Sequence, residues 1–126
     1  MREKKILTRA EFQVMQILWN LPGQAGYTGD ILKKYEAPKP AYTTLATFLK
    51  ILTNKGFVKF RKKGNKLYFM PVVTKTEYAE TYYAPVKDAF FQGSFLELMR
   101  FLLKKENLSE EEVNELIQLI HETQGK

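Results

Sequence analysis

The spacing of apolar residues changes abruptly at Gly56, and this change limits the folds that the chain can adopt. Before it, apolar side chains recur at helical intervals, as in Leu45, Leu49 and Leu52, which mark one buried helix face. After it, residues 58–69 alternate apolar and polar side chains around a basic, glycine-containing segment, which is the pattern of a β-hairpin. Beyond the hairpin the helical spacing returns.

Four helix starts are marked by Ser or Thr followed three residues later by Glu. In this capping box the hydroxyl and the carboxylate each accept a hydrogen bond from a free backbone N–H at the helix start. The pairs are Thr8 with Glu11, Thr74 with Glu77, Ser94 with Glu97, and Ser109 with Glu112. Together with the apolar spacing, they predict helices from Thr8 to about residue 20, then over 75–92, 94–105 and 109–122. Two more helices are expected from Thr28 to about Tyr35 and from near Ala41 to Lys55.

Three helices followed by a basic hairpin are the order of a winged helix-turn-helix domain. The expected fold class is therefore mostly α with a small β-hairpin. We expect a winged-helix DNA-binding domain over 1–74 and a helical dimerisation domain over 75–126. Pro85 lies inside the long helix of the second part, where we expect a kink or a break.

The positive charge of the chain is concentrated in its first part. The 126 residues include 20 Lys and Arg and 14 Asp and Glu, a formal net charge of +6. Residues 1–74 carry fourteen basic and four acidic side chains, and residues 75–126 carry six basic and ten acidic ones. A cationic first part favours a polyanionic partner such as double-stranded DNA. Chance clustering of solvated charges is the alternative.

The third expected helix has a small, polar outer side opposite its leucines. This side carries hydroxyl and methyl groups and one cation but no carboxylate, so it fits the major groove of DNA. The expected DNA contacts on this helix are Tyr42, Thr43, Thr44, Thr47 and Lys50. An ordinary solvated helix face is the alternative interpretation.

The hairpin tip gathers four cations within six positions. Phosphate contacts from such a tip contribute affinity through counterion release rather than sequence information. The expected phosphate contacts are Arg61, Lys62, Lys63 and Lys66. The alternative is a charged sheet edge that prevents aggregation.

The last 52 residues are too few to bury a core alone, yet they are rich in apolar residues at helical spacing. A second copy of the chain is the simplest partner for the apolar faces of these helices. The alternative is that the same helices pack back onto the winged-helix part of their own chain. The expected dimer contacts are Tyr82, Phe90, Phe95, Leu98, Met99, Leu102, Leu116, Ile117 and Ile120.

Several other classes of site are disfavoured by the residues present. The chain has no Cys, which excludes disulfides, thiolate metal sites and cysteine nucleophiles. The single His121 lacks companion metal ligands, and Ser94 and Ser109 are better explained as helix caps than as nucleophiles. We therefore expect no enzymatic activity, no metal and no cofactor. The chain has no transmembrane stretch, and its start lacks the apolar core of a signal peptide, so the expected location is the cytoplasm without membrane insertion.

The chain resembles the penicillinase repressor family, the BlaI/MecI-type regulators of β-lactam resistance. The resemblance covers almost the whole length and rests on five stretches in order: LTRAEFQVMQILW at 7–19, YTTLATFLKILTNKGFV at 42–58, YFMPVV at 68–73, FQGSF at 91–95 and LSEEEVNEL at 108–116. It implies a homodimeric winged-helix transcriptional repressor on a palindromic operator, with a dimer made by the C-terminal helices.

The resemblance also implies roles for single positions. Thr44 and Thr47 fall where family members place Thr on the recognition helix, and Ala46 stands where many members have Lys or Arg. In this family a membrane-bound sensor protease relieves repression by cutting the C-terminal part. The cleaved bond aligns with Arg100–Phe101, where Phe101 matches the family pattern and Arg100 departs from it.

Two rival functions remain at the level of sequence. A winged-helix protein-interaction module would use the apolar tail to dock a different protein and would be a monomer alone in solution. An architectural DNA binder would bind without sequence preference, which competition with random DNA would reveal.

Overall fold

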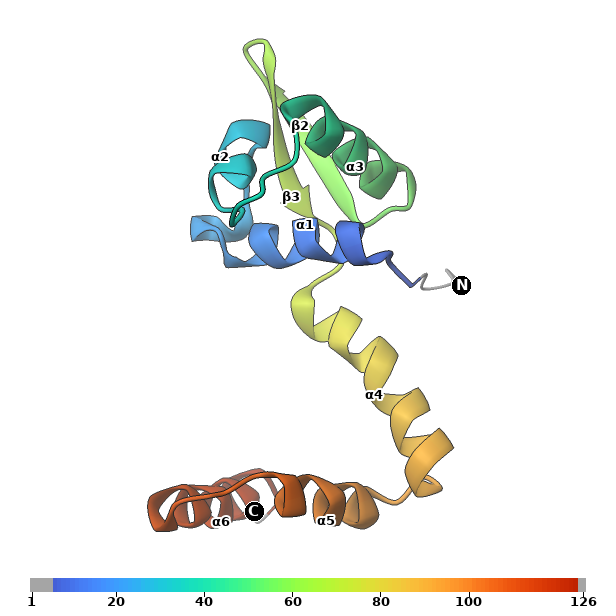
Figure 1. Cartoon of the computed structure of the whole chain (residues 1–126), viewed down its shortest axis with the longest axis vertical. Coiled ribbons are helices and arrows are strands. Elements are labelled where there is room, and N and C mark those ends of the chain that lie inside the picture. The colour runs from blue at the N-terminus through green and yellow to red at the C-terminus, as the bar shows by residue number, and fades with distance from the viewer. Residues whose placement is uncertain (1–5, 125–126) are drawn as a thin grey trace. The chain divides into compact units, whose positions relative to one another are not determined.

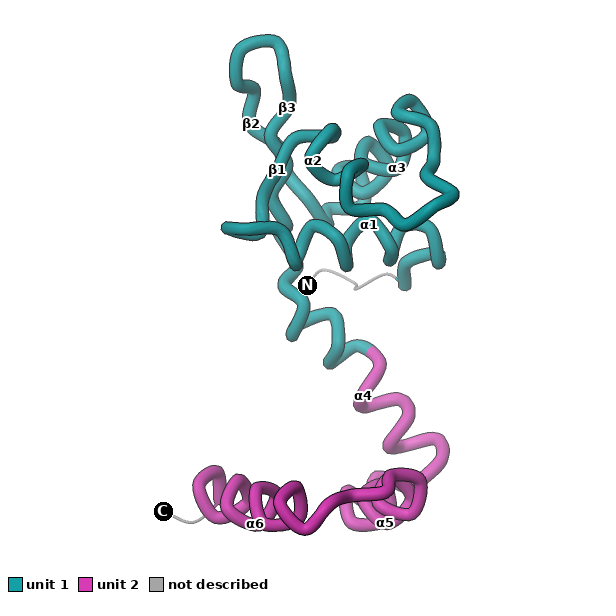
Figure 2. The backbone as a smooth tube through the Cα atoms, turned by 60° about the vertical axis from the view of Figure 1, so that its left-hand side comes forward, with its two compact units in different colours: residues 1–81 teal, residues 82–126 magenta. Residues whose placement is uncertain are grey.

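The computed structural model describes residues 6–124, and the chain divides into two compact units, 1–81 and 82–126 (Figure 2). Residues 1–5, which entered the expectation of no signal peptide, lie outside the described residues. The elements of the first part are α1 (Arg9–Asn20), the short 3-10 helix η1 (Pro22–Gln24), β1 (Gly26–Tyr27), α2 (Thr28–Lys33), α3 (Tyr42–Asn54), β2 (Val58–Lys63) and β3 (Lys66–Pro71). They are followed by α4 (Lys75–Phe91), α5 (Phe95–Lys105) and α6 (Glu110–Gln124). All six expected helices are present.

Three of the four expected capping boxes are complete. The Thr8 hydroxyl accepts from the Glu11 N–H at 3.2 Å, and the Glu11 carboxylate accepts from the Thr8 N–H at 3.1 Å. The same reciprocal bonds join Thr74 with Glu77 and Ser109 with Glu112. The Ser94 hydroxyl accepts from the Glu97 N–H at 3.1 Å, while the Glu97 carboxylate lies 3.4 Å from Arg100 Nε. Local sequence therefore sets where these helices begin.

The expected hairpin is part of a three-stranded antiparallel sheet of order β1-β3-β2. Strands β2 and β3 pair from Val58 opposite Pro71 to Lys63 opposite Lys66, and Gly64 takes the left-handed φ of 64° in the turn between them. The apolar pattern does not reveal β1, because a strand of two residues is too short to alternate. With helices α1–α3, the sheet forms a winged-helix domain whose hairpin projects past α3 (Figure 1).

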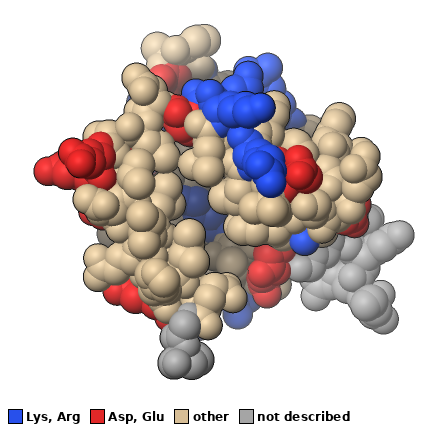
Figure 3. Space-filling model, turned by 90° about the horizontal axis from the view of Figure 1, so that it is seen from below, with Lys and Arg blue, Asp and Glu red and all other residues tan. Residues whose placement is uncertain are grey.

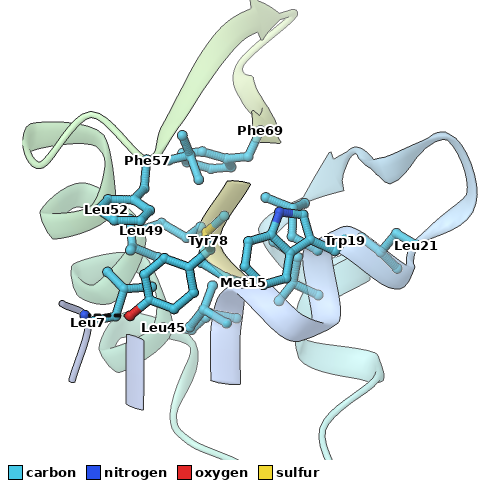
Figure 4. Close-up of a cluster of buried hydrophobic side chains, with 14 of the residues drawn as sticks. Leu7, Met15, Trp19, Leu21, Leu45, Leu49, Leu52, Phe57, Phe69 and Tyr78 are labelled. Carbon is cyan, nitrogen blue, oxygen red and sulfur yellow. Dashed lines mark hydrogen bonds between the residues drawn. The ribbon is translucent and has the colours of Figure 1, made fainter. Parts of the chain in front are cut away.

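A continuous apolar core fills the first unit between its helices and the sheet (Figure 4). Its largest fully buried side chains are Met15, Leu18, Ile31, Leu45, Leu49, Leu52, Val14 and Tyr78. Two polar groups at its margin are satisfied by distant residues. The indole N–H of Trp19 donates to the carbonyl oxygen of Val73 at 3.0 Å, and the backbone N–H of Leu7 donates to the Tyr78 hydroxyl at 2.8 Å.

The first turns of α4 belong to the winged-helix unit. The Tyr78 ring packs against Phe12, Trp19 and Phe57, with ring centroids between 5.6 and 6.2 Å apart. The boundary between the compact units consequently falls inside α4, after Thr81, rather than at the start of the helix as charge and capping suggested. Charge and capping carry no information about which core an aromatic side chain joins.

Helix α4 does not break at Pro85. It runs without interruption from Lys75 to Phe91, so of the expected kink or break the break does not occur. Proline removes one backbone N–H from the hydrogen-bond ladder and its ring crowds the carbonyl four residues earlier, but this proline is exposed to solvent. The flanking turns are sufficient to keep the helix continuous.

Candidate nucleic-acid interface

Helix α3 buries one side and exposes the side expected to meet DNA. Leu45, Leu49 and Leu52 are completely buried in the core of the first unit. All the expected contact residues of this helix are exposed, namely Tyr42, Thr43, Thr44, Thr47 and Lys50. The helical period therefore places these hydroxyl groups and the cation on one accessible surface.

The hydroxyl of Thr47 is already engaged within the helix. It donates a hydrogen bond to the carbonyl oxygen of Thr43 at 3.0 Å. Such a bond one turn back is common for threonine in helices, and it uses the only proton that the hydroxyl can donate. Thr47 thus exposes its methyl group and an oxygen lone pair rather than a donor.

A partly buried ion pair fixes the end of α3 to the start of α1. Lys55 Nζ lies 2.7 Å from Glu11 Oε1, and the Glu11 side chain is almost fully buried. Burial alone would raise the pKa of Glu11, but its bonds to Lys55 and Thr8 outweigh burial and hold this pKa below its usual value. The carboxylate therefore stays charged at neutral pH. It caps the start of α1 through the Thr8 N–H and pairs with Lys55 at the end of α3.

The hairpin β2–β3 presents the four expected cations on its exposed surface, at Arg61, Lys62, Lys63 and Lys66. Two tyrosines support this surface. The rings of Tyr27 and Tyr68 meet edge to face with centroids 5.1 Å apart, and Lys63 Nζ lies 4.0 Å from the centroid of Tyr68. This cation–π contact restricts the Lys63 side chain. The sequence did not reveal either tyrosine as part of this surface. Strand β1 has only two residues, so no alternating pattern predicts the pairing that brings Tyr27 beside Tyr68.

A cavity brings part of α3 and part of the hairpin together. Tyr42, Ala46 and Lys50 of α3 line it on one side, and Phe60 and Lys66 of the hairpin line it on the other. The remaining expected DNA contacts lie outside this lining. Phe60 alternates in sequence like a core residue, yet it is 48% exposed because only the base of the hairpin packs on the core. The tertiary structure thus joins the helix and the hairpin into one surface.

The second unit exposes most of the apolar side chains expected to form a dimer. Tyr82, Phe90, Phe95, Leu102, Leu116, Ile117 and Ile120 are all exposed, and Met99 is partly buried. No described residue of α6 is buried. Uncharged side chains cover most of the face seen in Figure 3. Leu98 differs from the others because it is 9% exposed in the single chain, and so has little surface left for a partner.

The residues of the expected cleavage site, Arg100 and Phe101, lie inside α5. Arg100 is exposed and its Nε lies 3.4 Å from Glu97 Oε2. Phe101 is 47% exposed, and its ring centroid lies 5.4 Å from that of Phe91. The bond between Arg100 and Phe101 is therefore helical backbone with exposed side chains on both sides.

The described residues offer neither a metal site nor a membrane-spanning helix. Within 6–124, no group of three or more His, Asp or Glu side chains is placed to hold a metal ion. Over the same residues, no helix has both the length and the apolar character needed to cross a membrane.

Comparison with known proteins assigns the family. The model of the penicillinase repressor family matches residues 7–122. The penicillinase repressor of Bacillus licheniformis is 27% identical, with 98% of this chain and 97% of that protein covered. The methicillin resistance regulatory protein MecI of Staphylococcus aureus is 26% identical, with 91% and 93% covered. These relatives are named as repressors or regulators rather than as enzymes. With its winged-helix fold and its exposed basic hairpin, the chain belongs to the penicillinase repressor family, whose members are DNA-binding transcriptional repressors.

Proposed function

We propose that this protein is a homodimeric repressor that binds a palindromic operator through α3 and the β2–β3 hairpin. The observation that carries the proposal is the shared surface, on which an exposed hydroxyl-rich helix and a cationic hairpin border one cavity. The first unit would bind DNA, and the second unit would hold two chains together. A dimer with a two-fold axis matches two half-sites of opposite orientation.

The two parts of the interface would contribute differently. On α3, Tyr42, Thr43, Thr44, Thr47 and Lys50 would enter the major groove and contact base edges. Arg61, Lys62, Lys63 and Lys66 would contact phosphates, which gives affinity that depends on salt but little on sequence. Preference for a particular operator would therefore come from α3, and most of the binding strength from the hairpin.

The second unit supports dimerisation through its exposed apolar side chains. Large apolar side chains are exposed on α4, α5 and α6, and α6 buries no described residue within the single chain. Many large apolar side chains exposed on one small unit are typical of a surface that a partner covers. Tyr82, Phe90, Phe95, Met99, Leu102, Leu116, Ile117 and Ile120 would lie in the dimer interface.

Proteolytic relief is the regulatory step that the family membership favours. A membrane-bound sensor protease would cut the bond between Arg100 and Phe101, which would separate the end of the dimerisation unit from the rest. Because this bond lies in α5, the helix must unwind locally before a protease can bind it in an extended form. Cleavage would weaken the dimer and so weaken operator binding.

The decisive experiment combines the mass of the protein in solution with selection of its DNA site. Sedimentation equilibrium of the full chain should give twice the mass of one chain. Selection from a random pool should enrich an inverted repeat, and random DNA should compete poorly for it. A monomer that ignores DNA would instead favour the protein-interaction module, and equal binding to random DNA would favour the architectural binder.

A matched pair of variants tests the dimer face. Ile120 is exposed on α6, so Ile120→Asp should leave the fold of one chain intact while it shifts the protein to monomers and weakens operator binding. Glu111→Ala, on the same helix, removes a charge and should leave the dimer unchanged. A dimer that resists Ile120→Asp would argue against this face as the interface.

A further inference from the structure

The cavity between α3 and the hairpin is large enough for a small molecule. It measures about 810 Å³, within the range of 300–1,000 Å³ typical of ligand sites. Residues 27–30, at the start of α2, also line it. The whole cavity lies within the first unit, so its walls are parts of one compact structure.

The lining of this cavity is more apolar than phosphate binding requires. Phe60 is 48% exposed, Leu67 is 38% exposed and Tyr42 is 55% exposed, although they lie in the most basic part of the chain. Phe69 and Ala46 extend the apolar lining between them. Exposed aromatic and aliphatic side chains that converge on a cavity are typical of a site for a flat, apolar group.

The charged groups around the cavity favour an anion. Lys33, Lys50 and Lys66 line it, and Asp30 is the only carboxylate among the lining residues. Its Oδ2 accepts a hydrogen bond from the Tyr27 N–H at 2.9 Å, and the lining still carries three cations against this one carboxylate. Lys66 Nζ lies 5.9 Å from the centroid of the Tyr27 ring, so an aromatic surface and a cation occur side by side. The ligand that fits both features is an aromatic ring system with one negative charge.

We propose that this cavity binds a small aromatic carboxylate, with the ring against Phe60, Leu67 and Tyr42 and the carboxylate toward Lys50 and Lys66. The binding itself does not depend on DNA. Its consequence rests on the proposed function, because Tyr42, Lys50 and Lys66 are also expected DNA contacts. An occupied cavity would therefore compete with the operator, and the ligand would act as an inducer that needs no proteolysis.

Titration with naphthoate tests the site directly. In two-dimensional NMR spectra of the full chain, the amide shifts should cluster at 27–30, Ala46 and 66–67. Naphthylmethanol, which has the same ring system but no charge, should bind about fivefold more weakly, the ratio expected for one screened charge interaction of about 1 kcal/mol. Shifts confined to 82–124, no shifts at millimolar naphthoate, or equal binding of the two compounds would overturn the proposal.

Two alanine-to-leucine variants separate filling of the cavity from a general effect on the protein. Ala46→Leu places a larger side chain in the cavity and should weaken naphthoate binding at least tenfold. Ala79→Leu makes the same change on an exposed part of α4, away from the cavity lining, and should bind naphthoate like the unmodified protein. Equal weakening in both variants, or in neither, would refute the assigned site.

Fluorescence anisotropy with a DNA site selected by this protein tests the competition. Naphthoate should raise the apparent Kd of the unmodified protein for DNA. For Ala46→Leu, the apparent Kd with naphthoate should equal the Kd that the same variant shows without naphthoate. Failure to bind any DNA without naphthoate would refute the proposed function but not the cavity site. Full DNA binding by naphthoate-saturated protein would refute the inducer role.

Discussion

The backbone N–H of Leu7 donates a hydrogen bond of 2.8 Å to the hydroxyl of Tyr78, a residue 71 positions away (Figure 4). Both residues are buried, with Leu7 just before α1 and Tyr78 in the first turns of α4. This bond joins the two ends of the winged-helix unit across its core. The start of α4 is consequently part of the winged-helix unit and not a free linker.

Loss of the Tyr78 hydroxyl should destabilise the winged-helix unit. Tyr78→Phe keeps the ring but leaves the buried Leu7 N–H without its acceptor, which costs about 1–3 kcal/mol. Chemical denaturation followed by tryptophan fluorescence measures this cost, because Trp19 packs against Tyr78. An unchanged free energy of unfolding would show that the bond contributes nothing.

Tyr35 provides the matched comparison. Its hydroxyl is also buried but has no hydrogen-bond partner among the described residues, and burial raises its pKa. Tyr35→Phe removes a polar group that gains nothing from folding, so the free energy of unfolding should stay the same or rise by up to about 1 kcal/mol. A loss as large as that of Tyr78→Phe would contradict this reasoning.

The Glu11–Lys55 ion pair should make stability depend on pH at the acidic end. Because the folded-state pKa of Glu11 is lowered, the carboxylate stabilises the fold above its ordinary pKa, and this stability is lost as the pH falls through the folded pKa. Glu11→Gln should cost about 1–3 kcal/mol at neutral pH, and its denaturation curve should approach that of the unmodified protein once the pH falls below the lowered folded-state pKa of Glu11. Glu97→Gln is the control, because Glu97 and Arg100 are both more than half exposed, and it should cost less than about 1 kcal/mol. A constant difference between Glu11→Gln and the unmodified protein at all pH values would exclude the ion pair as its source.

The hairpin cations should control the salt dependence of DNA binding. The double variant Lys62→Ala/Lys63→Ala removes two phosphate contacts, so the slope of log K against log salt should become shallower by about 2 for every DNA sequence tested. Lys104→Ala/Lys105→Ala removes the same charge from α5 and should leave the slope unchanged. Equal slopes for the two double variants would remove the hairpin from the interface.

The methyl group of Thr47 should matter more for DNA preference than its hydroxyl. Since the hydroxyl already donates to Thr43, Thr47→Val should bind the selected DNA site within about threefold of the unmodified protein. Thr47→Ser, which lacks the methyl, should discriminate less between thymine and uracil in that site, by up to about fourfold for one buried methyl. Abolished binding by Thr47→Val would mean that the hydroxyl turns outward to contact DNA.

The sequence by itself determined the local structure and the family of this protein. Helix starts follow from side chains three residues apart, and the hairpin follows from alternation around Gly64, so both are visible in short stretches. The outer side of α3 was also predictable, because the period of a helix fixes which residues oppose Leu45, Leu49 and Leu52.

Only the tertiary structure decided which distant residues meet. The pairing of Tyr27 with Tyr68, the bond from Leu7 to Tyr78, and the cavity between Ala46 and Phe60 each depend on how separate elements pack. Helical period and strand alternation describe one element at a time, and they do not specify the neighbour across a core or a sheet. For that reason the amino-acid sequence predicted a DNA-binding helix and a basic hairpin. The surface that they share, with its apolar cavity, became visible only in the tertiary structure.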